Sequence, residues 1–391
     1  MQLAGRMSRL GTESAFEVLA RANAIASTGR SVINLGIGQP DFATPANVVE
    51  AARKALADGH HGYTPSNGIP ELRAAVAGDL EQRIGVSVDP DCVVVVPGGK
   101  VTMAMAMMMF GEPGGEIMYP DPGFPIYESM IRYSGAEPVP IRLYEDNNFS
   151  FSADELLASI TPRTRLIILN SPANPTGGVV AKAELDALVA GLEAHPHVVV
   201  MSDEIYSRMT YDGFEHVSLL TYPSIRDRLI LLDGWSKTYA MTGWRMGFGL
   251  WPRPLVDDAV RLCINIHSCV NASAQYAGIE ALQGPQDAVT DMVAAFDERR
   301  SIVVDELNRI PGFRCVVPKG AFYAFPNVSA SGHTAKELQD RLLEEAGVAA
   351  IAGTSFGAQG EGYLRFSYAN SVPNIREAMS RIRAWMGQNA G

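Results

Sequence analysis

The sequence predicts an α/β protein with a large domain, in which a mostly parallel central sheet lies between helices, and a smaller α+β domain. Between about residues 90 and 252, short runs rich in β-branched residues alternate with amphipathic stretches, as strands joined by helices do. After a long predicted helix over 285–310, strand-like and helical stretches follow without this alternation, which is typical of an α+β unit. With 391 residues, the chain is long enough for two domains.

The large domain is predicted to cover residues 46–284. Strands are expected over the runs CVVVVP, EIMYPD, RLIILNSP, VVVMSDE, RLILLDG and MGFGLW, which begin at residues 92, 116, 165, 198, 228 and 246. Helices are expected over 181–195, 253–267 and 271–283. We expect the methionine-rich run 101–111 to be the buried face of a core helix rather than a pliable binding surface.

The smaller domain is predicted to cover residues 285–391. Its strands are expected over 313–317, 321–325 and 363–369, and its later helices over 334–347 and 375–387. Residues 1–45 form an N-terminal segment that we expect to pack with the smaller domain, although the pattern alone allows either part.

Composition excludes several classes of protein. The net charge of −11 argues against a nucleic-acid or anionic-membrane partner. The four cysteines form no CxxC pair, so we expect neither a metal site nor a disulfide framework, but reduced thiols in the cytoplasm. Residues 1–29 carry charges throughout, unlike a signal peptide, and the run 101–111 is too short to span a membrane.

Polar residues follow several predicted strands, at the edge of an open α/β sheet where functional groups gather. The turn 97–100, Pro-Gly-Gly-Lys, opens a helix and could hold a phosphate on its backbone N–H groups, or simply join strand to helix. Asn174 lies in a turn-forming sequence after another strand. Asp203 follows apolar residues, so we expect it to cap a helix or pair with a cation, with Tyr206 on the same side.

Lys237 follows the next predicted strand, and lysine is rarely buried without a partner. In a desolvated site a lysine has a lowered pKa and forms Schiff bases with aldehydes. Arg245 is close in sequence, and its guanidinium can hold a phosphate through two hydrogen bonds. If Asp203 pairs with a pyridinium nitrogen, the three residues describe a pocket for pyridoxal 5′-phosphate.

These residues belong to a series of motifs that covers essentially the whole chain: NLGIGQPDF, GYTPSNGIPELR, PGGK, NSPANPTGG, SDEIY, SKTYAMTGWRMG, PKGAFY and YLRFSYA. With them the chain resembles the class I/II pyridoxal-phosphate aminotransferases of fold type I, in the subgroup of bacterial aspartate and aromatic aminotransferases. The resemblance implies the fold type I architecture, pyridoxal 5′-phosphate as cofactor, and a homodimer with shared active sites.

The resemblance also implies roles for the matching residues. Three are catalytic: Lys237, which forms the internal aldimine and moves a proton between substrate Cα and cofactor C4′, Asp203 at the pyridine nitrogen, and Tyr206 at the phenolic oxygen. Further cofactor contacts are implied for Asn174 at the phenolic oxygen, Phe124 on the ring face, Gly99, Lys100 and Arg245 at the phosphate, and Tyr63 at the phosphate of the neighbouring subunit. The implied substrate ligands are Gly38, Asn174 and Arg365, the last clamping the α-carboxylate.

One position departs from the family pattern. Many relatives carry a serine phosphate ligand three residues before the lysine, whereas this chain has Gly234, and Ser236 does not obviously replace it. The substrate side chain is left open. The candidates to meet a distal carboxylate are Lys100, His267, Arg6 and Arg9, and those to line an apolar pocket instead are Phe16, Phe322 and Tyr323.

The predicted function is transamination between an L-amino acid and a 2-oxo acid in amino-acid biosynthesis, by a ping-pong mechanism through a lysine aldimine. One alternative is a carbon–sulfur β-lyase on the same fold, and another is a non-catalytic regulatory protein. The motifs NLGIGQPDF and TGWRMG favour transamination over the lyase. The presence of Lys237, Asp203 and Arg365 argues against a non-catalytic protein.

Overall fold

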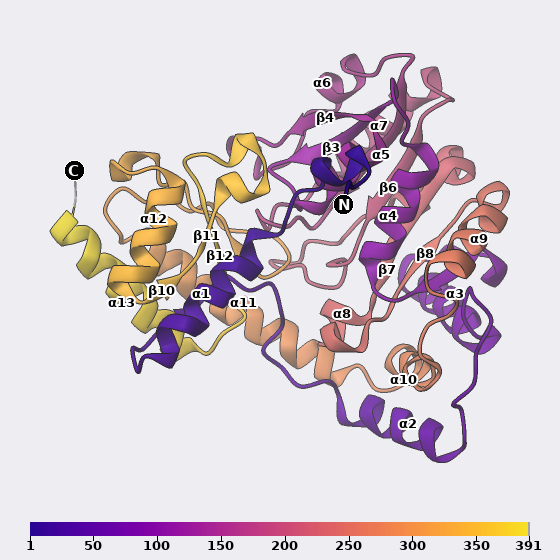
Figure 1. Ribbon diagram of the computed structural model, residues 1–391, viewed down its shortest axis with the longest axis horizontal. Coiled ribbons are helices and arrows are strands. Elements are labelled where there is room, and N and C mark those ends of the chain that lie inside the picture. The colour runs from indigo at the N-terminus through magenta and orange to yellow at the C-terminus, as the bar shows by residue number, and fades with distance from the viewer. Residues whose placement is uncertain (390–391) are drawn as a thin grey trace.

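A seven-stranded sheet forms the centre of the larger part of the molecule in the computed structural model, which describes residues 1–389 (Figure 1). Its strand order is β2-β8-β7-β6-β5-β3-β4, and within this sheet only β8 is antiparallel to its neighbours. The bounds are Val93–Val96 (β2), Glu116–Asp121 (β3), Glu137–Arg142 (β4), Thr164–Asn170 (β5), Val199–Asp203 (β6), Leu229–Gly234 (β7) and Gly247–Leu250 (β8). The predicted mostly parallel sheet is confirmed. The unpredicted strand β4 contains two prolines, which an edge strand tolerates.

Helices cover both faces of this sheet because its strands are apolar on both sides. Along β2, Val93 and Val95 pack into one core while Val94 and Val96 pack into the other. One face is covered by α4 (Gly99–Phe110), α5 (Ile126–Ser134) and α9 (Val256–Ile266), and the other by α2 (Ala46–Ala57), α3 (Pro70–Ile84), α7 (Lys182–Gly191) and α10 (Ala272–Gln283). The short α6 (Ala153–Ala158) packs beside α7. The methionine-rich run is the core helix α4, as predicted, with Met105 and Met107 fully buried.

The C-terminal part is built on a three-stranded antiparallel sheet in the order β11-β12-β9. Its elements are α11 (Asp287–Leu307), β9 (Tyr323–Ala324), α12 (Ala335–Arg341), β10 (Val348–Ala349), β11 (Ile351–Ala352), β12 (Leu364–Ser367) and α13 (Val372–Asn389). The strand expected over 313–317 is wrong. Both backbone groups of Cys315 bond to the side-chain amide of Asn308, so they are not available for a ladder, and Arg314 forms an isolated bridge with Asn327.

The N-terminal segment crosses from one part of the molecule to the other (Figure 1). Its helix α1 (Ser14–Ser27) lies beside β10 and β11, and β1 (Ile33–Asn34) pairs in parallel with β10. The first residues instead reach α5, where Arg9 Nε donates to the carbonyl of Arg132 at 2.7 Å. The contacts of α1 and β1 support grouping residues 1–45 with the smaller domain. The limits 46–284 and 285–391 stay predictions.

No helix within residues 1–389 is long and apolar enough to cross a membrane.

Candidate active site

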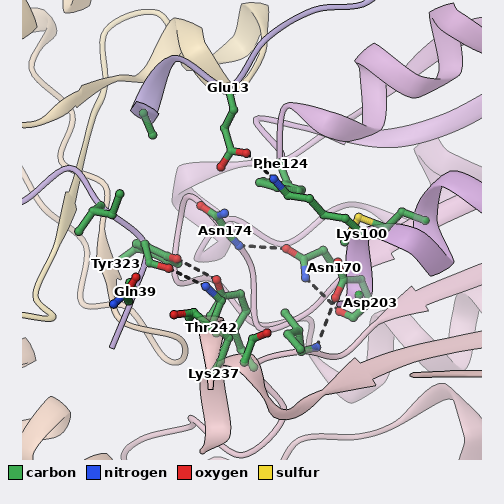
Figure 2. A pocket seen from close by; sticks show the side chains of 18 of the residues that line it. Glu13, Gln39, Lys100, Phe124, Asn170, Asn174, Asp203, Lys237, Thr242 and Tyr323 are labelled. Atoms are coloured by element: carbon green, nitrogen blue, oxygen red, sulfur yellow. Dashed lines mark hydrogen bonds and ion pairs between the residues drawn. The ribbon is translucent and has the colours of Figure 1, made fainter. Parts of the chain in front are cut away.

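A cavity of about 530 Å³ lies where the carboxyl ends of β2, β5, β6 and β7 come together (Figure 2). Ten of the predicted site residues line it: Gly38, Gly99, Lys100, Phe124, Asn174, Asp203, Tyr206, Lys237, Arg245 and Arg365. It is also lined by three residues that were not predicted: Glu13, Tyr127 and Asn170. Side chains far apart in the sequence therefore converge at one edge of the sheet, as predicted.

Lys237 lies in the short helix α8 (Trp235–Thr238), which begins directly after β7. Its Nζ donates to the carbonyl of Gly38 at 2.5 Å. Burial, together with the nearby positive charge of Arg365, lowers the pKa of Lys237 to about 8. About a tenth of this side chain is therefore the neutral amine at pH 7, the form that acts as nucleophile and base.

Asp203 is a buried carboxylate at the end of β6. Its Oδ2 accepts a hydrogen bond from the Tyr127 hydroxyl at 2.6 Å, and its Oδ1 accepts one from the backbone N–H of Ile205 at 3.3 Å. Asn170, at the end of β5, donates from Nδ2 to the Asp203 carbonyl at 3.0 Å. Burial raises the pKa of Asp203 to about 7. A cationic ring nitrogen placed in the cavity would lower the pKa of this carboxyl again and favour its ionised form.

Arg365 is a buried cation on β12 that no carboxylate neutralises within residues 1–389. Its Nη1 donates to Asn174 Oδ1 at 2.9 Å and its Nη2 to the carbonyl of Gly36 at 2.5 Å. Its Nε is buried without a hydrogen-bond partner. A buried charge with an unsatisfied donor is costly, so this guanidinium fits a site that takes up an anion such as a carboxylate.

The turn between β2 and α4 has the shape of a phosphate cradle. Gly98 has a φ of +92°, and a Cβ there would collide with the guanidinium of Arg245. Arg245 itself donates from Nη1 to the carbonyl of Thr242 at 2.8 Å. Gly99 begins α4, so free backbone N–H groups and the positive end of the helix dipole face the same place as the guanidinium.

The structure gives a reason for the glycine that departs from the family pattern. A Cβ on Gly234 would lie 2.8 Å from the Cα of Gly247 on β8, so the two strands approach too closely here for a serine. Ser236, in contrast, lines the cavity.

Several candidate residues lie elsewhere. Tyr63 is 93% exposed and does not line the cavity, and its predicted contact with a neighbouring subunit stays a prediction. Three candidate cations are absent from the lining: Arg6, Arg9 and His267. Phe322 is also absent, because it is fully buried and stacked on Phe296.

Lys100 does line the cavity, but its charge is already paired. Its Nζ lies 2.5 Å from Oε2 of Glu13, and Figure 2 shows the two side chains pointing toward each other, away from Lys237. Phe16 and Tyr323 line the cavity and give its wall an aromatic character. Among residues 1–389, no group of three or more His, Cys, Asp or Glu side chains could hold a metal ion.

An amine of lowered pKa, a buried carboxylate and a turn shaped to hold a phosphate lie together at one sheet edge, an arrangement that fits pyridoxal 5′-phosphate, and the fold is that of the fold type I enzymes. The chain belongs to the aminotransferases of class I and II, whose family profile matches residues 30–382. It is a pyridoxal-phosphate-dependent transaminase.

Several known proteins and solved structures are similar to this chain over nearly its full length. An aspartate aminotransferase of Geobacillus stearothermophilus is 37% identical over all of both chains. An aromatic-amino-acid aminotransferase of Thermococcus litoralis is 38% identical over 90% of each chain. The crystal structure of an aspartate aminotransferase from Rhizobium meliloti superposes with a TM-score of 0.94 at 36% identity, covering 99% of each chain. These names differ in substrate, so they do not assign one to this chain.

Proposed function

We propose that the substrate amino acid lies along the backbone segment 36–38, with its α-carboxylate on Arg365 and its Cα facing Lys237. One observation carries this proposal: Arg365 Nη2 and Lys237 Nζ donate to carbonyls of the same short segment, at Gly36 and Gly38. A carboxylate clamp and a neutral amine side by side are what an α-amino acid requires. Gly38 has to be glycine because a Cβ would lie 2.5 Å from the Tyr323 hydroxyl.

The cofactor, when bound, supplies an electron sink that makes the substrate α-proton acidic. Asp203 would hold its ring nitrogen, and Tyr206 and Asn174 its phenolic oxygen. Asn174 suits this role because Arg365 donates a hydrogen bond to its amide oxygen, which leaves the amide N–H groups to donate to the cofactor. Phe124 would contact the ring face. The proposed phosphate ligands are Gly99, Lys100 and Arg245, and the position of Ser236 supports adding its hydroxyl to them.

Lys237 moves the proton in this proposal. With the cofactor bound, its neutral amine would take the proton from substrate Cα and release it toward C4′, and the second half-reaction, with a 2-oxo acid, would run the same transfer in reverse. The pKa of about 8 supports the role, because a general base works best when its pKa is near the working pH. Arg365 serves both half-reactions, since the amino acid and the oxo acid carry the same α-carboxylate.

A homodimer with shared sites and a cytoplasmic location are also part of this proposal. Tyr63 supports the dimer, because an exposed aromatic side chain outside the cavity is available to a second copy. The four cysteines are free thiols, which supports a reducing compartment. Tyr63 would then complete the phosphate site of the partner.

A half-reaction tests the proposed chemistry directly. We expect the yellow holoenzyme to bleach on addition of a suitable L-amino acid without any oxo acid, and to release one 2-oxo acid per chain, because the amino group remains on the enzyme. Adding a 2-oxo acid should restore the colour. Continuous release of ammonia and oxo acid with persistent colour would indicate a β-lyase instead.

A further inference from the structure

Tyr127 is a cavity residue outside the predicted site, and its side chain bonds directly to the carboxylate of Asp203. It lies near the start of α5, is fully buried, and places its hydroxyl 2.6 Å from Asp203 Oδ2. Its ring meets Phe124 edge to face, with centroids 5.8 Å apart. The ring is therefore held in position by packing, and the hydroxyl is held against the carboxylate.

The direction of this hydrogen bond is fixed. Burial and the charge of Asp203 raise the pKa of Tyr127 well above its ordinary value, so the hydroxyl stays protonated and donates a hydrogen bond to the carboxylate. Within residues 1–389 this is the single side-chain hydrogen bond that the Asp203 carboxylate receives. The other bond, from the Ile205 N–H, is long at 3.3 Å.

Burial is the largest effect that opposes ionisation of Asp203, and two neighbouring carboxylates add to it. Asp233 on β7 and Glu204 in the adjoining position both raise the pKa of Asp203, whereas the bond from Tyr127 lowers it. The donors around Glu204 are committed to Glu204 itself: Ser202, Ser218, the Leu219 N–H and His216. Asp233 accepts a hydrogen bond from the N–H of Gly234 and forms an ion pair with Arg83. The remaining titratable groups near Asp203 are Tyr206 and Lys237.

We propose that Tyr127 is a positioning residue for the cofactor, acting through Asp203. Its hydroxyl favours the ionised form of the carboxylate and fixes its orientation before the cofactor arrives, so that the carboxylate can accept a hydrogen bond from the ring N–H. This proposal rests on the proposed role of Asp203. It assigns to Tyr127 the task of offsetting the repulsion from Asp233 and Glu204.

Cofactor binding by the cofactor-free protein tests this. Tyr127→Phe removes the hydroxyl and keeps the ring. We expect it to bind pyridoxal 5′-phosphate about tenfold more weakly, as loss of a charge-assisted hydrogen bond implies. The ionised carboxylate is the binding form, so affinity falls as pH drops through its pKa of about 7. The variant raises that pKa, so the fall should begin about one pH unit higher than in the wild type.

A cofactor analogue with C–H in place of the ring nitrogen separates positioning from packing. It cannot donate to Asp203, so Tyr127→Phe should bind it as tightly as the wild type does. Tyr211→Phe is the matched control: it also removes a buried hydroxyl, which donates to the Ala321 carbonyl at 2.5 Å, and it should change neither affinity. Equal weakening toward cofactor and analogue, from packing or misfolding, would overturn the proposal, and so would unchanged cofactor affinity.

Asp203→Asn distinguishes failure of this inference from failure of the proposed function. If Asp203→Asn loses cofactor affinity and Tyr127→Phe does not, the inference about Tyr127 is wrong and the role of Asp203 stands. If neither variant loses affinity, Asp203 does not hold the ring nitrogen and the proposed cofactor arrangement is wrong as well.

Discussion

Lys237→Ala should abolish transamination and leave a folded protein that still binds pyridoxal 5′-phosphate. Loss of a general acid–base residue costs typically 10²–10⁴-fold in rate, and loss of the covalent attachment adds to this. Asp203, Arg245 and the turn at 98–99 remain to hold the cofactor. Single-turnover kinetics with one amino donor would measure the effect, and thermal unfolding would show that the fold is intact.

Lys182→Ala is a suitable control for this experiment. Lys182 is an exposed lysine on α7 that does not line the cavity, and its ammonium pairs with Asp186 on the same helix. We expect its transamination rate to equal that of the wild type. A Lys237→Ala protein that retains more than about a tenth of the wild-type rate would show that another group moves the proton.

Arg365→Leu should raise KM for the amino acid and for the oxo acid together. Each substrate loses a charge-assisted pair worth about 1.5–3 kcal/mol, which corresponds to about ten- to a hundredfold in KM. Cofactor affinity should hardly change, because within residues 1–389 Asn174 is the only proposed cofactor ligand to which Arg365 donates a hydrogen bond. Steady-state kinetics with each substrate varied in turn would measure both constants.

The exposed Arg309, which pairs with Glu306 at the end of α11, provides the matched arginine. Arg309→Leu should leave both KM values unchanged. An Arg365→Leu protein with lost cofactor and unchanged KM would mean that Arg365 binds the cofactor rather than the substrate.

The arrangement of the site could be predicted because the carboxyl end of each parallel strand lies at a known edge of the sheet. Asp203 and Lys237 each follow an apolar run, and the carboxyl ends of neighbouring parallel strands necessarily meet at one edge. The turn at 97–100 could be recognised for the same reason. Residues outside the sheet, such as Arg365, depended on the resemblance to known aminotransferases, because no local pattern brings β12 to the cavity.

Other contacts could not be predicted because they join side chains across long separations. Glu13 and Lys100 are 87 residues apart, and nothing around Glu13 indicates that α1 begins beside the cavity. Tyr127 and Asp203 are 76 residues apart. The motif DPGFPIY did carry a signal for Tyr127, since it places Tyr127 three residues after Phe124, whose ring it contacts edge to face.

Local hydrogen bonds explain why no strand forms over residues 313–317. The run 313–317 has β-forming residues, but the Asn308 side chain forms hydrogen bonds with the backbone groups of Cys315 that a strand would need.

Phe322 lies in the motif PKGAFY, yet its side chain points into the core against Phe296, while its neighbour Tyr323 lines the cavity. In an extended segment successive side chains point to opposite faces, and the sequence alone does not say which face is the cavity.

The identity of the lysine that carries the cofactor is the central claim of this account. Borohydride reduction of the yellow holoenzyme, followed by proteolysis and mass spectrometry, would locate the pyridoxyl group on a single peptide. We predict that the group lies on Lys237, in the segment GWSKTYAMTGWR. A pyridoxyl group on Lys100 or on any other lysine would contradict the assignment of the active site.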